Sequence, residues 1–95
     1  MSDSERSEKI PVERVQIGAR LEKRMVKVLK GLAEYLDMSL GDLLEGIVLH
    51  AFESQPPFGE DTMRRIGQLK EVYGMDYGVE ASHRLADRVS HREEG

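Results

Sequence analysis

The sequence predicts a mainly α-helical protein with one short β-strand near its start. From Val15 to Leu21 apolar residues alternate with polar or small ones, which is the period of a half-buried strand. After Glu22 apolar residues recur at steps of three and four, which is the period of amphipathic helices. A lone strand leaves backbone N–H and C=O groups unpaired, so we expect it to pair antiparallel with the same strand of a second copy.

The expected strand covers residues 13–21 and follows a Ser- and Glu-rich flexible N-terminal arm, residues 1–11. One face of the strand is apolar and consists of Val15, Ile17, Ala19 and Leu21. The opposite face consists of Arg14, Gln16, Gly18 and Arg20. A homodimer is therefore expected to bury the first face and to present the second to a partner.

Two amphipathic helices are expected next, over about residues 22–36 and 40–54. The first has a basic outer face made of Lys23, Arg24, Lys27 and Lys30. Ser39 is the expected N-cap of the second, with Asp42 three residues later in a capping-box pattern. The wide apolar stripe of the second helix predicts that it is the most buried element. The expected core consists of Leu29, Leu32, Leu43, Leu44, Ile47, Val48 and Phe52. Gly31 and Gly46 are expected to permit close helix approach.

Pro56 and Pro57 end the second helix, and a third helix is expected over Glu60–Tyr73 with Gly74 as its stop. A weaker fourth helix is expected over about residues 79–90. The sequence thus divides into the N-terminal arm, a domain over residues 12–54, and an acidic helical extension over residues 55–95.

Composition limits the classes of protein that fit. The chain has 95 residues, 39% of them hydrophobic, and a formal net charge of −4, so we expect oligomerisation to add stability to a small core. It contains no cysteine, which excludes disulfides and thiolate metal sites. The polar start argues against a secretory signal, and no apolar stretch is long enough to span a bilayer. We therefore expect a cytoplasmic protein that does not contact membranes.

Charge is distributed unevenly along the chain. Residues 1–30 hold eight Lys or Arg and five Asp or Glu, whereas residues 31–95 hold six and thirteen. This asymmetry is typical of a protein whose basic end faces a polyanion, although a solvated helix face produces the same pattern. His50, His83 and His91 lack a metal-site spacing, and no nucleophile, base or phosphate-loop motif is present. We therefore expect no enzyme activity, no metal and no cofactor.

Residues 12–54 resemble the ribbon-helix-helix DNA-binding family of the MetJ/Arc type. The resemblance is carried by R-V-Q-I-G-A-R-L at 14–21, by the basic amphipathic helix after it, and by L-D-M-S-L-G-D-L-L at 36–44. It implies a homodimer whose two-stranded antiparallel ribbon enters the major groove of double-stranded DNA. It also implies that two dimers can occupy neighbouring half-sites.

The resemblance assigns base reading to Arg14, Gln16, Gly18 and Arg20. It assigns phosphate contacts to Lys23, Arg24 and the backbone N–H groups of Ser39, Leu40 and Gly41. Arginine can bond guanine O6 and N7 and glutamine can bond adenine N6 and N7, which suits sequence-specific recognition. The expected function is that of a transcriptional repressor or autoregulator.

One alternative belongs to another class. A dimeric protein-interaction module, antitoxin-like or an adaptor, would use residues 60–95 to bind a protein partner, with DNA binding weak or absent. Gly18 offers no side chain to a base, and Asp42 places a carboxylate near the expected phosphate site. These two residues and the overall acidity favour the alternative, whereas the Arg/Gln face and the basic helix favour DNA.

Overall fold

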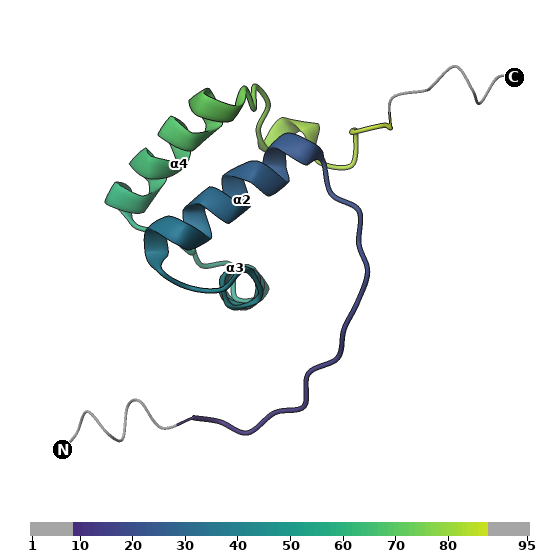
Figure 1. The fold of residues 1–95 in the computed structure, drawn as a ribbon, viewed down its shortest axis with the longest axis vertical. Helices are drawn as coiled ribbons and strands as arrows, with labels where there is room; N and C mark the ends of the chain where they lie inside the picture. Colours follow the sequence, from purple (N-terminus) through teal and green to yellow (C-terminus); the bar gives the residue numbers. More distant parts are fainter. Residues whose placement is uncertain (1–8, 88–95) are drawn as a thin grey trace, which may run out of the picture.

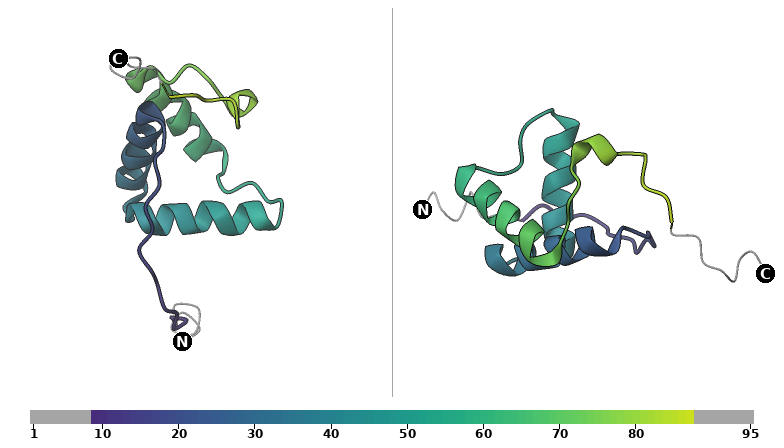
Figure 2. Two further views of the ribbon diagram at one scale, coloured as in Figure 1. Left: turned by 90° about the vertical axis from the view of Figure 1, so that its right-hand side faces the viewer. Right: turned by 90° about the horizontal axis from the view of Figure 1, so that it is seen from above.

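The computed structural model describes residues 9–87, which form three α-helices and one 3₁₀ turn. The elements are α2 (Lys23–Leu36), α3 (Leu40–Phe52), α4 (Glu60–Tyr73) and η1 (Val79–Ala81). Helix α2 packs against both α3 and α4 (Figure 1). Helix α3 crosses α2 steeply, whereas α4 lies alongside it (Figure 2). Within residues 9–87, none of the helices has the length and apolar character needed to cross a lipid bilayer.

The helix boundaries follow from local chemistry. Glu22 is the N-cap of α2, and Asp37 ends that helix in the left-handed conformation with φ 59°. The Ser39 hydroxyl accepts a hydrogen bond from the Asp42 amide at 3.1 Å, which confirms Ser39 as the N-cap of α3. Helix α4 has the predicted limits, and Gly74 with φ 69° confirms the predicted stop.

The core is small and lies where α2 meets its two neighbours. Its buried residues are Val28, Leu32, Ala33 and Leu43. Partly buried side chains around the cluster are Leu29, Leu36, Ile47, Phe58, Ile66 and Leu69. Three of these come from the chain after residue 55, so the C-terminal extension covers the core. We call α2, α3 and α4 together the helical body.

The two glycines that were predicted to permit close helix approach, Gly31 and Gly46, have different surroundings. A Cβ added at Gly31 would lie 3.0 Å from Cδ2 of Leu69, which confirms that Gly31 permits the close approach of α4. A Cβ added at Gly46 would meet nothing within 4 Å, so the packing role predicted for Gly46 is wrong.

The predicted β-strand over residues 13–21 is wrong, and with it the fold class of a ribbon-helix-helix homodimer with an intersubunit ribbon. The part of the chain that the structure describes contains helices and turns and no strand or sheet. Residues 9–21, which we call the leading segment, run away from the helical body as a single exposed stretch (Figure 1). A strand exists only when its backbone is paired, and the backbone beyond residue 22 is already used in helices and turns. The apolar residues predicted to be buried on the strand are therefore exposed, Val15 by 78% and Ile17 by 80%.

Three further expectations are corrected. Helix α3 is not the most buried element, because it has one buried residue whereas α2 has three. Its predicted core residues Val48 and Phe52 are exposed, by 44% and 79%. In place of the described part of the fourth helix there is only η1, and His83 at φ 65° adopts a left-handed conformation unlike that of a helix. Residues 88–90 of that predicted helix, and residues 1–8 of the predicted arm, lie outside the described residues.

Candidate nucleic-acid interface

The four residues predicted to read bases all lie on the leading segment and are exposed. Gln16 points from a stretch that is in water along its whole length. Gly18 has open space around it, since an added Cβ would meet nothing within 4 Å. Arg14 and Arg20 each bind a carboxylate of a different part of the chain, so the two ends of the segment have different neighbours.

Arg14 links the leading segment to α3 through an exposed ion pair. Its Nε and Nη2 donate to the two carboxylate oxygens of Glu45 at 2.8 Å and 2.7 Å, which is the paired geometry typical of arginine and carboxylate. The bond to Glu45 raises the pKa of Arg14, and Asp42 adds a weaker attraction in the same direction. The same pair lowers the pKa of Glu45. In Figure 1 the backbone of the leading segment runs apart from α3, so these two long side chains bridge the space between them.

Arg20 pairs with the other end of the described chain. Its Nη2 donates to Oδ2 of Asp87 at 2.6 Å, and the two side chains are 85% and 77% exposed. An ion pair this exposed is screened by water and contributes little to stability. Arg20 therefore has a weakly held partner that another anion can replace.

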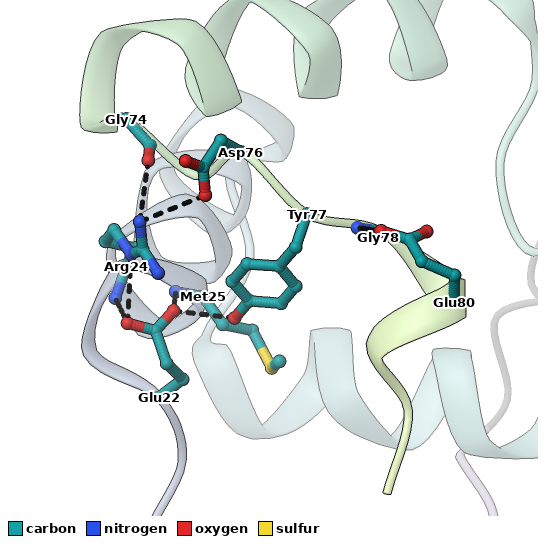
Figure 3. Close-up of polar contacts among 8 residues, drawn as sticks. All are labelled: Glu22, Arg24, Met25, Gly74, Asp76, Tyr77, Gly78 and Glu80. Atoms are coloured by element: carbon teal, nitrogen blue, oxygen red, sulfur yellow. Dashed lines mark hydrogen bonds and ion pairs between the residues drawn. The ribbon is translucent and has the colours of Figure 1, made fainter. Parts of the chain in front are cut away.

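Arg24 belongs to a denser group that we call the Glu22 clasp, made of Glu22, Arg24, Gly74, Asp76 and Tyr77 (Figure 3). The Arg24 guanidinium donates to Glu22 Oε2 at 3.1 Å, to the Gly74 carbonyl at 3.0 Å and to Asp76 Oδ1 at 3.2 Å. It also lies over the Tyr77 ring, 5.4 Å from the centroid. Residues after α4 therefore fix this guanidinium.

Glu22 is the acceptor at the centre of the clasp. Its carboxylate accepts from the backbone amides of Arg24 and Met25, at 3.1 Å and 3.3 Å, and from the Tyr77 hydroxyl at 2.6 Å. The Tyr77 bond, aided by those of Arg24 and Met25, lowers the pKa of Glu22 to about 2. Burial, followed by the bond to Glu22, raises the pKa of Tyr77 to about 12. A charged Glu22 and a protonated Tyr77 thus close the clasp at neutral pH.

Two lysines complete the basic start of α2. Lys23 and Lys27 are exposed, and neither makes an ion pair within residues 9–87. The Lys27 ammonium lies 5.8 Å from the centroid of the Tyr73 ring. Lys23 is one of the predicted phosphate contacts, and a phosphate that bound it would not have to displace a carboxylate of residues 9–87.

The N-terminus of α3 is open to solvent at Ser39 and Gly41. Amides in the first turn of a helix have no partner inside the helix, so those of Leu40 and Gly41 point toward a possible anion site. The Asp42 amide is already bound by the Ser39 hydroxyl. The Asp42 carboxylate lies in the same first turn and opposes an anion there.

The structure divides the predicted site into two groups. Arg14 binds Glu45 in the second turn of α3, whereas Arg20 and Arg24 bind residues of the C-terminal extension. Sequence reasoning missed the carboxylates and the tyrosine that hold these arginines. The missed residues are Glu22, Glu45, Asp76, Tyr77 and Asp87. An acidic residue directly before the helix was a local signal for Glu22 as N-cap, but the other four are distant in sequence from their partners and leave no local pattern.

No cluster of three or more His, Asp or Glu side chains that could hold a metal ion occurs within residues 9–87. Comparisons of this chain with protein-family models, with curated proteins and with solved structures returned no match. The family resemblance of residues 12–54 therefore stays a prediction.

Proposed function

We propose that the chain forms a homodimer that binds double-stranded DNA sequence-specifically, as a cytoplasmic transcriptional repressor or autoregulator. The observation that carries the proposal is the leading segment, which holds Arg14, Gln16 and Arg20 outside the helical body and in water. It joins the basic start of α2 directly, where Lys23 continues the same charge. Cationic side chains on an exposed segment can reach both phosphates and base edges.

The dimer is proposed because a single chain leaves too much apolar surface in water. The exposed apolar residues of the leading segment are Ile10, Val12, Val15, Ile17 and Leu21. The second half of α3 adds Val48, Leu49 and Phe52. Exposed apolar surface in two parts of the chain favours an interaction site, and a second copy supplies a matching surface by symmetry. Two such dimers on neighbouring half-sites extend the same proposal.

The intramolecular ion pairs are compatible with DNA binding. Those of Arg14 and Arg20 are exposed, so a phosphate can replace Glu45 or Asp87 at little cost. Lys23 has no described carboxylate partner to lose, and the amides at the start of α3 offer a second phosphate contact. The proposed interface thus consists of the leading segment, the start of α2 and the start of α3.

A titration of duplex DNA at several salt concentrations tests this function. We expect the logarithm of the binding constant to fall linearly with the logarithm of salt concentration. Arg20→Ala is expected to cost about 1–3 kcal/mol of binding free energy if Arg20 reads a base. Arg84→Ala is the matched control, because Arg84 is equally an exposed arginine and its side chain, among residues 9–87, bonds the Glu80 carbonyl of its own turn and no carboxylate. Equal affinities of the two variants, or no binding at any salt concentration, would contradict the proposal.

One observation favours the second candidate, a dimeric protein-interaction module. Each of Arg14, Arg20 and Arg24 is already paired with a carboxylate of the chain itself. A chain that neutralises its own arginines is suited to a partner other than a polyanion. Indifference of the titration to salt and to Arg20→Ala would favour this candidate over DNA binding.

A further inference from the structure

A groove of about 1060 Å³ lies between the start of α2 and the end of α4. Residues 85–87 and the last residues of the leading segment, Arg20 and Leu21, complete its lining. Its lining shares Leu21 with the proposed dimer surface, and Arg20, Lys23 and Arg24 with the predicted DNA contacts. The rest of its apolar lining is assigned to neither and needs an explanation of its own.

The groove combines exposed apolar side chains with an aromatic one. Val72 of α4 is 71% exposed, and Leu21 and Leu85 are each 49% exposed. Met25 and Tyr73 complete this apolar part of the lining. Apolar side chains that converge on a concave surface in water are typical of a protein-binding site.

The groove is also positively charged. Its lining contains four cations, which are Arg20, Lys23, Arg24 and Lys27. It contains two carboxylates, and one of them, Glu22, is consumed by the hydrogen bonds of the Glu22 clasp. The other, Asp87, pairs with Arg20 at 2.6 Å. Carboxylates of the chain itself therefore already pair with Arg20 and Arg24. Lys23 and Lys27 make no ion pair within residues 9–87 and can bind carboxylates of a partner.

We propose that this groove binds an acidic segment of a partner protein that carries apolar side chains between its carboxylates. Charge complementarity selects the acidic residues, and the surface around Val72 selects the apolar ones. A nucleic acid does not account for the whole groove, because phosphates would contact the lysines but leave the apolar lining in water. The inference goes beyond the proposed DNA binding, with which it shares Arg20, Lys23 and Arg24.

The experiment measures the fluorescence anisotropy of a labelled synthetic peptide that alternates leucine with glutamate, titrated with the full chain. Two further peptides separate the contributions, one with glutamine for glutamate and one with serine for leucine. We expect saturable binding of the first peptide only. Lys23→Gln with Lys27→Gln is expected to weaken it about tenfold, and Val72→Ser about threefold or more.

The control for net charge is Lys9→Gln with Lys30→Gln, which removes two exposed lysines that do not line the groove. Circular dichroism checks that each variant keeps its helices, which is expected because the substituted side chains are all exposed. Equal weakening by both lysine pairs would overturn the proposal, since binding would then follow net charge alone. Equal binding of the serine peptide and the leucine peptide would make the groove a general polyanion site and would overturn the proposal. The proposal would also be overturned if duplex DNA displaced the leucine peptide and Val72→Ser bound that peptide as tightly as the original chain. No saturable binding would overturn it as well. Because DNA binding is measured separately with Arg20→Ala, failure here leaves the proposed function standing.

Discussion

Val15→Ser gives the most direct test of whether a second copy covers the leading segment. Val15 is 78% exposed in the single chain and contacts none of the core residues, so a monomer should tolerate serine there within about 0.5 kcal/mol of unfolding free energy. In a dimer that buries the segment, most of this side chain leaves water. Burial of a valine is worth about 1.5 kcal/mol, and a symmetric dimer buries two, which gives about 3 kcal/mol per dimer.

That free energy corresponds to a dissociation constant about one hundred times higher for Val15→Ser than for the original chain. Sedimentation equilibrium measures it directly, and thermal unfolding at two protein concentrations provides a second readout, since the melting temperature of a dimer depends on concentration. Val79→Ser is the matched control, because Val79 is 90% exposed and lies on η1, outside the proposed dimer surface. The same dissociation constant for both variants, or a monomer at every concentration, would refute the reasoning.

Three further predictions concern the helical body and the clasp. Gly46→Ala should raise the free energy of unfolding by about 0.5–1 kcal/mol in urea titrations, because an open helical site gains helix propensity; no gain would show that the site is occupied. Gly31→Ala should be less stable than Gly46→Ala, because its Cβ would lie 3.0 Å from a methyl of Leu69; equal stability would refute the close approach. The pKa of Glu22 is lowered from its ordinary value of 4.5 to about 2. The stabilisation of the folded chain by charged Glu22 is therefore fully present above pH 4.5 and is lost as the pH falls toward 2. Tyr77→Phe should move that loss to higher pH, which an NMR titration of the Glu22 carboxyl group measures. An unchanged titration midpoint of Glu22 would exclude the bond to Tyr77 as the main cause of the lowered pKa.

Local signals in the sequence were sufficient for α2, α3 and α4 and insufficient for the strand. The limits of α4, the Ser39 N-cap and the Gly74 stop depend on neighbouring residues, so they could be predicted. The alternation from Val15 to Leu21 was real, but a strand requires a backbone partner as well as a period. Apolar periodicity shows that a segment has two faces and leaves open what, if anything, covers one of them. The same reason explains why Phe52 fits a core by its spacing and is exposed in the single chain.

The candidate site was predictable in its cations and unpredictable in their partners. Arg14, Arg20 and Arg24 were identified from charge and position, and the structure places the first two on the leading segment and the third in the first turn of α2. Their carboxylates come from α3 and from the chain after α4, at sequence separations of 31, 67 and 52 residues. Pairings over such distances are consequences of packing, and no local pattern encodes them.

The Glu22 clasp gives the C-terminal extension a direct effect on the proposed DNA-binding face. Glu22 caps α2 and is also the residue at which the leading segment joins the helical body. Because Tyr77 donates to Glu22, and Gly74 and Asp76 hold Arg24, residues after α4 fix the point from which the leading segment departs. The direction of that segment therefore depends on the extension as well as on α2. A partner that binds the groove beside the clasp would contact the same junction, so protein binding and DNA binding would be coupled through Glu22 and Arg24 and would not be independent.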